Sequence, residues 1–211
     1  MGKRAFIFAA GEHKADDLKL YKRIKIHEDD LILCADGGYD TLALLGTKPD
    51  VVIGDLDSVR TTIPPQIKTV KYPSDKDKTD LEICIDYAAE SGCDSLLILG
   101  ALGGRVDHSL ASLYAMRYAL EKGMESMILS AHTRVYLVSD YLKLSRESFD
   151  YISLIPCTDK VSGVTTSGLK YNLENATLHQ SSSLGVSNEF YNNTALIKIE
   201  KGLLFVICLE E

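Results

Sequence analysis

One stretch of the chain places a strand, a turn and a helix start in immediate succession: Leu96-Leu97-Ile98-Leu99-Gly100-Ala101-Leu102-Gly103-Gly104-Arg105-Val106-Asp107-His108. In an open α/β sheet, the passage from the carboxyl end of a strand to a helix N-terminus is where backbone amides bind anions. Arg105 adds a side chain that can hold a phosphate in bidentate fashion. The glycine spacing matches neither a Walker A loop nor the dinucleotide fingerprint. The stretch therefore predicts an α/β fold with a phosphate site of another kind.

Outward from this stretch, strand-like runs alternate with segments of helical period through the first two thirds of the chain. The alternation predicts a mainly parallel αβα (Rossmann-like) domain. For one helix, 79–91, we expect Thr79 as N-cap with Glu82 completing a capping box. For the other, 107–121, we expect Asp107 as N-cap and a buried stripe of Leu110, Leu113, Tyr114, Arg117 and Tyr118. The strand-like runs are 5–9, 31–35, 51–53, 69–72, 96–99, 127–129 and 135–138.

The last third of the chain loses the helical period. Short strand-like runs separated by polar turns follow, a spacing typical of a small β-sandwich or barrel. A polar stretch between Tyr141 and Phe149 sets the predicted domain boundary, with residues 1–142 in the α/β domain and 143–211 in a β-sandwich. The expected strands are 151–155, 160–165, 168–171, 176–179, 188–191, 195–199 and 203–209.

The amino-acid composition favours some classes of binding partner over others. The 211 residues are 45% hydrophobic and carry 23 basic against 30 acidic side chains, a net charge of −7. This balance argues against a nucleic-acid or anionic-membrane surface and favours a small-molecule ligand. Five scattered cysteines indicate reduced core thiols in a cytoplasmic protein, and no apolar run approaches the roughly 20 residues that a membrane span needs.

Two acidic segments, Gly54-Asp55-Leu56-Asp57-Ser58 and Asp75-Lys76-Asp77-Lys78-Thr79-Asp80, also follow strand-like runs. Asp55 and Asp57 project to the same side of an extended backbone and can share a hard cation. Paired aspartates without histidine or cysteine favour magnesium over zinc. Two simpler interpretations stay open: Asp55 and Asp57 in a solvated turn, and the second segment as helix-dipole partners. His108 is more often a cap or packing residue than a catalyst.

These three segments, with Cys34-Ala35-Asp36-Gly37-Gly38 upstream, resemble the thiamine pyrophosphokinase (thiamine diphosphokinase) family. Downstream, Val164-Thr165-Thr166-Ser167-Gly168-Leu169-Lys170-Tyr171-Asn172-Leu173 and Gly185-Val186-Ser187-Asn188-Glu189-Phe190 are similar to the two C-terminal substrate motifs of the family. The resemblance extends from about residue 30 to residue 190. One departure is Tyr171, where many members carry tryptophan; tyrosine offers a smaller face for stacking. Apart from the resemblance, Tyr171 is equally well explained as a buried sheet residue.

The resemblance implies an N-terminal catalytic domain that binds ATP and magnesium, followed by a thiamine-binding and dimerisation domain. It implies a homodimer with active sites between subunits, and the reaction of ATP with thiamine to give thiamine diphosphate and AMP. By the same resemblance, Asp55, Asp57 and Asp80 hold magnesium. Phosphates or the attacking hydroxyl are positioned by Asp36, Gly37, Gly38, Ser58, Asp77, Thr79, Arg105 and Asp107, and thiamine is contacted by Tyr171, Ser187 and Asn188, with Ser187 and Asn188 reaching the site from the second subunit.

Several alternatives stay open at this point. Either Asp80 or Asp107 could accept the hydroxyl proton. The same apparatus could serve another alcohol, such as a hydroxymethylpterin, or belong to a non-catalytic nucleotide or thiamine sensor. A metal-dependent phosphohydrolase is a further possibility. Formation of AMP, and its dependence on thiamine, separates these functions.

Overall fold

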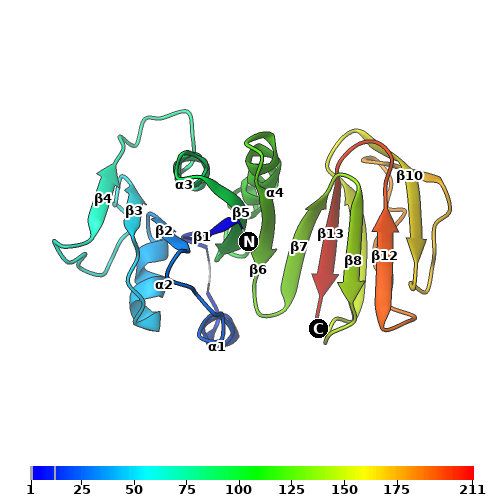
Figure 1. The fold of residues 1–211 in the computed structure, drawn as a ribbon, viewed down its shortest axis with the longest axis horizontal. Coiled ribbons are helices and arrows are strands. Elements are labelled where there is room, and N and C mark those ends of the chain that lie inside the picture. The colour runs from blue at the N-terminus through cyan, green and yellow to red at the C-terminus, as the bar shows by residue number, and fades with distance from the viewer. Residues whose placement is uncertain (1, 12) are drawn as a thin grey trace. The chain divides into compact units, whose positions relative to one another are not determined.

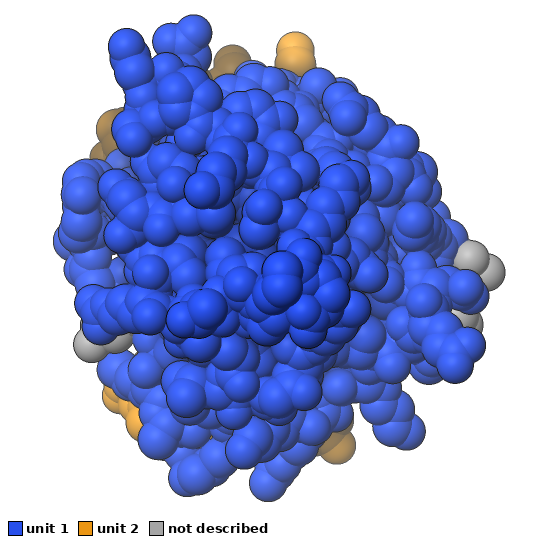
Figure 2. Space-filling view, turned by 90° about the vertical axis from the view of Figure 1, so that its left-hand side faces the viewer, with its two compact units in different colours: residues 1–131 blue, residues 132–211 orange. Residues whose placement is uncertain are grey.

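The computed structural model describes residues 2–11 and 13–211 and divides into two compact units, residues 1–131 and 132–211, coloured blue and orange in Figure 2. Unit 1 contains a parallel sheet in the order β4-β3-β2-β1-β5-β6. Its strands are β1 (Lys3–Phe8), β2 (Leu31–Ala35), β3 (Val51–Gly54), β4 (Lys68–Lys71), β5 (Cys93–Leu99) and β6 (Glu125–Leu129). Its helices are α1 (Ala15–Tyr21), α2 (Gly38–Leu45), α3 (Asp80–Glu90) and α4 (Val106–Glu121). The predicted parallel αβα domain is confirmed.

Helices cover both faces of this sheet: within unit 1, Figure 1 shows α1 and α2 on one side of the strands and α3 and α4 on the other. The inner strands β2 and β3 are consequently wholly apolar, as is typical of strands covered on both faces, whereas the edge strand β4 is polar and largely exposed. β1 lies between β2 and β5, and the chain leaves β1 and β5 in opposite directions. The loops after these two strands therefore diverge and open a crevice at the carboxyl edge of the sheet.

Of the two N-cap residues predicted from the sequence, Thr79 is confirmed and Asp107 is not. Thr79 caps α3 and forms the expected capping box, since its hydroxyl accepts from the Glu82 amide while the Glu82 carboxylate accepts from the Thr79 amide. The prediction of Asp107 as the cap of α4 is wrong, because Arg105 occupies the cap position and Asp107 lies in the first turn. Gly103 and Gly104, at φ of 92° and 65°, turn the chain early enough for the helix to begin at Val106.

The predicted buried stripe of α4 is also wrong. Leu110 and Tyr114 are 52% and 43% exposed. The helix instead buries a face of mainly small side chains, which lets it approach its neighbours α3 and β6 closely. That face consists of Ser112, Ala115, Met116 and Ala119. Residue size therefore outweighed apolar periodicity in deciding which side of α4 faces inward.

Unit 2 is a sandwich of two antiparallel sheets, β7-β13-β9 and β11-β10-β12-β8, as predicted. Both sheets contribute to one apolar core, for example Leu154 and Val206 from the first and Val164 and Ile197 from the second. The strands are β7 (Thr133–Val138), β8 (Tyr141–Ser145), β9 (Tyr151–Pro156), β10 (Lys160–Ser167), β11 (Ala176–His179), β12 (Thr194–Lys198) and β13 (Leu204–Leu209).

The division between the units falls after Ala131, earlier than the 142/143 boundary expected from the sequence. β7 pairs with β13 and β8 pairs with β12, so both strands belong to the sandwich. Each of these two strands pairs with a strand some 50 to 70 residues later in the chain, and no local sequence pattern indicates that pairing. The expected strands 168–171 and 188–191 are reduced to isolated bridges, one of them between Leu169 and Phe190.

All five cysteines are buried and none forms a disulfide bond, which confirms the prediction of reduced core thiols. Burial raises the pKa of the Cys34 and Cys84 thiols, so both are protonated at neutral pH. Across the described residues, no helix combines the length and the apolar character needed to cross a membrane.

Candidate active site

A crevice of about 630 Å³ lies at the carboxyl edge of the unit 1 sheet. The loops after β1, β2 and β5 and the first turns of α3 and α4 form its walls. Segments that are far apart in the sequence, and that the sequence marked separately, thus meet at one cavity. The residues that line it include Ala10, Gly11, His13, Asp36, Gly37, Asp40, Ser58, Arg60, Thr79, Asp80, Gly103, Gly104, Arg105 and His108.

Three carboxylates gather around Asp36, which lines this crevice, whereas Asp55 and Asp57 are not among the lining residues. Asp36, Asp55 and Asp57 each offer an oxygen, and these oxygens lie within 4.8 Å of one another. Asp36 is buried, and its Oδ1 has no hydrogen-bond partner among the described residues. A buried carboxylate oxygen is costly without a partner, and a hard divalent cation bound by carboxylates would supply one. The three side chains therefore fit a magnesium ion.

The backbone around these carboxylates is strained. Asp36 has a φ of 46° and Leu56 a φ of 67°, values that L residues rarely adopt, and Gly54 has a φ of 151°. A Cβ on Gly54 would lie 3.0 Å from the Asp36 Cβ and 3.2 Å from Asp80 Oδ1. Only glycine at position 54 therefore allows these two acidic side chains to come so near the strand end. Strain of this kind concentrates at functional sites.

Asp80 also lies close to Gly54 and forms an ion pair with Lys76 at 3.0 Å. Burial raises the pKa of the Asp80 carboxyl, the charges of Asp36 and Asp55 add to this, and Lys76 offsets only part of it. The structure thus groups Asp36 with Asp55 and Asp57, whereas the resemblance had grouped Asp80 with them. The proposed assignment of Asp80 as a metal ligand stays a prediction.

Asp55 and Asp57 are held by their own neighbours. The Asp57 amide donates to Asp55 Oδ1 at 3.2 Å, and the Ser58 hydroxyl donates to Asp57 Oδ1 at 3.0 Å. A hydrogen bond from Ser74 lowers the pKa of the Asp55 carboxyl, and the Asp57 amide and the charge of Lys76 lower it further. Asp55 is consequently an anion at neutral pH, as a metal ligand must be.

Arg105 and Asp107 pair at the opposite wall of the crevice. The Arg105 Nε and Nη2 atoms lie 3.1 and 2.5 Å from the two Asp107 oxygens. This pairing lowers the pKa of Asp107 to about 2. Both side chains are more than 60% exposed, so the pair is a weak surface ion pair that a phosphate can replace.

The remaining predicted residues of unit 1 have distinct surroundings. Thr79 lines the crevice, but its hydroxyl is already engaged in the capping box with Glu82. Gly37 lines the crevice as well. Gly38 has a packing role, since a Cβ there would lie 1.9 Å from the Phe8 carbonyl oxygen. Asp77 is exposed in the turn before α3 and is not among the lining residues.

Among the titratable residues that line the crevice, sequence reasoning missed three, Asp40, Arg60 and His13. The Asp40 carboxylate accepts from the Arg60 amide at 3.0 Å and the Thr61 amide at 2.7 Å, and so holds the loop that follows Asp57 and Ser58. The Arg60 side chain lines the crevice. His13 lines it too, and burial lowers the pKa of its imidazole. Asp40 has a sequence signal, an acid in a first helical turn, but nothing local marks Arg60 or His13.

A second cavity of about 220 Å³ lies in unit 2 and is lined by Tyr171 and Asn188 together with Leu173, Ser183, Leu184, Gly185 and Val186. The Asn188 amide is buried and fully occupied by main-chain groups: its oxygen accepts from the Tyr171 amide at 3.0 Å, and its nitrogen donates to the Tyr171 carbonyl at 2.7 Å. Ser187, at a φ of 55°, donates its amide to the Ser153 hydroxyl at 3.0 Å. Tyr171 is 61% exposed. Asn188 therefore holds the Tyr171 main chain while the Tyr171 ring faces solvent.

Comparison with known proteins gives consistent matches to both units. The family model described as "Thiamin pyrophosphokinase, catalytic domain" matches residues 23–128, and "Thiamin pyrophosphokinase, vitamin B1 binding domain" matches residues 141–204. The thiamine pyrophosphokinase of Bacillus subtilis is 29% identical over 187 residues, covering 85% of this chain and 87% of that protein. Thiamine pyrophosphokinase 2 of Arabidopsis thaliana is 29% identical over 222 residues, covering 86% of this chain and 79% of that protein.

Solved structures agree with this result. The crystal structure of thiamine pyrophosphokinase from Bacillus subtilis superposes with a TM-score of 0.85 at 25% identity, covering 99% of both chains. The yeast thiamin pyrophosphokinase structure superposes with a TM-score of 0.79 at 16% identity, covering 99% of this chain and 86% of that one, and supports the fold alone. The two matched family models together span most of the chain. The chain therefore belongs to the thiamine pyrophosphokinase family and is an enzyme of that class.

Proposed function

We propose that this enzyme transfers the diphosphoryl group of ATP to the primary hydroxyl of thiamine, giving thiamine diphosphate and AMP. The observation that carries the proposal is the crevice whose walls include Asp36, a member of the Asp36, Asp55 and Asp57 cluster, and the glycine turn with Arg105. Transfer of a phosphoryl group mainly requires positioning and neutralisation of charge, which these residues supply.

Asp36, Asp55 and Asp57 would hold magnesium in this proposal, with Asp80 beside them. When bound, the ion would neutralise phosphate charge and orient the triphosphate. The amide of Gly104, just before α4, favours a phosphate oxygen, whereas the Gly103 amide already donates to the Ser109 hydroxyl at 3.2 Å. Arg105 would exchange its exposed pair with Asp107 for a bidentate contact to phosphate. Ser58, which also lines the crevice, would add a hydroxyl contact, and Thr79 would contact phosphate only by leaving its capping box with Glu82.

The chemical step forms a bond between the thiamine hydroxyl oxygen and the β-phosphorus of ATP. The bond from that phosphorus to the oxygen that bridges it to the α-phosphorus breaks, and AMP leaves with the electron pair. The hydroxyl proton passes to a carboxylate. We assign this role to Asp80, because its raised pKa makes it a better base than Asp107, whose pKa is about 2.

The thiamine end of the reaction would use Tyr171 as a stacking face for the aminopyrimidine ring. Asn188 supports this face through the Tyr171 main chain, because its own amide has both polar atoms engaged there. Ser187 contributes the adjacent hydroxyl. An aromatic face held on a rigid backbone loses little conformational entropy when it binds a ligand.

Asn188→Ala tests this arrangement. We expect the KM for thiamine to rise about tenfold or more, and the KM for ATP to stay within about twofold, because truncation releases the Tyr171 backbone. Asn192→Ala, an exposed asparagine nearby, is the matched control and should leave both values unchanged. Tyr171→Ala should reproduce the thiamine effect with little loss of thermal stability. Equal losses for thiamine and ATP would contradict the assignment.

The proposed function is tested directly by incubating purified protein with ATP and magnesium, with and without thiamine. AMP and thiamine diphosphate are then quantified by mass spectrometry. We expect AMP only when thiamine is present, in a 1:1 ratio with thiamine diphosphate, as the reaction stoichiometry requires. Release of AMP without thiamine would indicate a phosphohydrolase, and absence of AMP would indicate another acceptor or a binding role.

We further propose that the enzyme is a homodimer whose sites combine residues from both subunits. Mixing two impaired variants, Asp57→Asn and Tyr171→Ala, after reversible dissociation should then raise activity at thiamine concentrations well below its KM to about a quarter of wild type, because each mixed dimer has one intact site. A mixture no more active than the average of the two separate variants, while mass measurement shows mixed dimers, would exclude shared sites. A cytoplasmic location is also proposed, and five buried cysteines that form no disulfide bond support it, since disulfides are rare in that compartment.

A further inference from the structure

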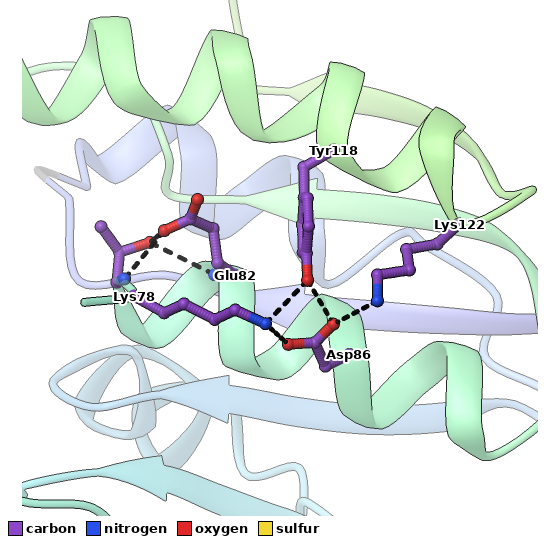
Figure 3. A network of polar contacts seen from close by, with 6 residues as sticks. Lys78, Glu82, Asp86, Tyr118 and Lys122 are labelled. Atoms are coloured by element: carbon purple, nitrogen blue, oxygen red, sulfur yellow. Dashed lines mark hydrogen bonds and ion pairs between the residues drawn. The ribbon is translucent and has the colours of Figure 1, made fainter. Parts of the chain in front are cut away.

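A network of polar contacts joins α3 to α4 away from the crevice (Figure 3). Lys78 Nζ lies 2.5 Å from Asp86 Oδ2 and 2.8 Å from the Tyr118 hydroxyl. The Tyr118 hydroxyl donates to Asp86 Oδ1 at 2.5 Å, and Lys122 Nζ lies 3.1 Å from the same oxygen. Asp86 is thus held by two cations and a phenol: Lys78 from the segment before α3, and Tyr118 and Lys122 from the end of α4.

The network is more than an exposed ion pair. The Asp86 side chain is 21% exposed, and the Tyr118 ring has both ammonium groups 5.2 Å from its centroid. Burial alone would raise the pKa of Asp86, but the hydrogen bonds from Lys78, Tyr118 and Lys122 outweigh it and lower that pKa. Asp86 is therefore ionised at neutral pH. Charge-assisted bonds that share one partly buried acceptor order the groups that donate them.

The position of Lys78 links this network to the candidate active site. Lys78 directly precedes Thr79, the cap of α3, and Asp80, both of which line the crevice. Tyr118 lies on α4, whose cap is Arg105. At about 1.5 Å of rise per residue, Asp86 is roughly 9 Å along α3 from Asp80, and Tyr118 roughly 20 Å along α4 from Arg105. The network therefore acts at a distance, through two helices whose N-terminal ends carry crevice residues.

We propose that Asp86 is a positioning residue, which holds Lys78 and Tyr118 together and so fixes the N-terminal end of α3 relative to α4. The consequence is a set distance between the Asp80 carboxylate and the Arg105 guanidinium. This inference rests on the proposed function, because it concerns the geometry of the MgATP site. A helix end that shifts by a fraction of an ångström lowers the rate of a reaction that depends on alignment.

The test compares Asp86→Asn, Tyr118→Phe and Lys78→Met with wild type by steady-state kinetics for both substrates. We expect kcat/KM for MgATP to fall about tenfold in Asp86→Asn while the KM for thiamine stays within about twofold. Lys78→Met should give a similar loss. The double variant Lys78→Met with Asp86→Asn should have the same kcat/KM for MgATP as either single variant, because both substitutions remove the same Lys78–Asp86 bond. Asp86→Glu, which keeps the charge, should recover part of the activity.

Glu121→Gln is the matched control, since it breaks the Arg117–Glu121 pair at 3.0 Å on the exposed side of α4, outside the network. It should leave all kinetic values unchanged. The inference would be overturned by wild-type kinetics in Asp86→Asn, or by equal increases in both KM values, which indicate a general loss of structure. Wild-type protein without thiamine-dependent AMP formation would instead refute the proposed function, so the two failures are distinguishable.

Discussion

Asp57→Asn is expected to reduce turnover roughly 10²-fold or more, the cost of losing one strong electrostatic contact to a transition state. Asp57 is the exposed member of the Asp36, Asp55 and Asp57 cluster, and an amide oxygen is a much poorer magnesium ligand than a carboxylate. The fold should be unaffected. Three clustered carboxylates repel one another, and a substitution at an exposed position usually changes the free energy of unfolding by less than about 0.5 kcal/mol.

Two measurements check this expectation. Turnover is measured over a range of magnesium concentrations, and the midpoint of thermal unfolding is measured with and without MgATP. Wild type should gain stability from MgATP, because a ligand that binds only the folded state raises its midpoint. Asp57→Asn should lose most of that gain while keeping the same midpoint as wild type without ligand. Asp94→Asn, an exposed aspartate beside the amino end of β5, is the control. Retained turnover in Asp57→Asn, or a collapsed midpoint, would refute the metal-ligand role.

The second large effect is on stability. Gly38→Ala is expected to lower the free energy of unfolding by about 2–3 kcal/mol, within the range that overpacking costs in a well-packed interior. The added methyl group would lie 1.9 Å from the Phe8 carbonyl oxygen and 2.5 Å from its carbon. Both are backbone atoms of the central strand β1, so they cannot move aside as a flexible side chain can. The first turn of α2 would have to shift away from the sheet.

Thermal unfolding checks this prediction, with an expected drop of roughly 5–10 °C for a protein of this size. Gly37→Ala is the matched control one residue earlier. Its nearest neighbours would be 3.3 Å away and include the Ala10 methyl group, so a shift of a few tenths of an ångström relieves the contact. A Gly38→Ala midpoint equal to that of Gly37→Ala would show that α2 adjusts freely and that the close approach is not required for stability.

Much of the fold was predictable because its signals are local. The Thr79–Glu82 capping box involves residues three apart and formed as expected. The apolar runs of β2, β3 and β5 are short and continuous, typical of strands covered on both faces. The glycine turn before α4 was recognised from the sequence, although the helix begins at Val106 and not after Asp107. Each of these features depends on neighbours within a few residues.

The inward face of α4 was not predictable in the same way. Leu110 and Tyr114 have large apolar side chains, yet the buried face of α4 consists of Ser112, Ala115, Met116 and Ala119, which the packing against other elements selects. The membership of β7 and β8 in the sandwich likewise depends on partners much later in the chain. Asn188 was taken from the resemblance as a thiamine contact, and only the three-dimensional structure places its amide on the Tyr171 backbone.

The sequence by itself determined the fold class, the family resemblance and the segments that form the crevice, because periodicity, caps and motifs are properties of short stretches. Tertiary structure alone decided which carboxylates meet. Asp36 is 19 residues from Asp55, yet the parallel pairing of β2 with β3 brings their strand ends together. It also decided that Asp80 pairs with Lys76 beside that cluster, and that Asp86 joins α3 to α4. Contacts between residues so far apart in the sequence depend on strand order and helix packing, which are set by interactions across the whole unit.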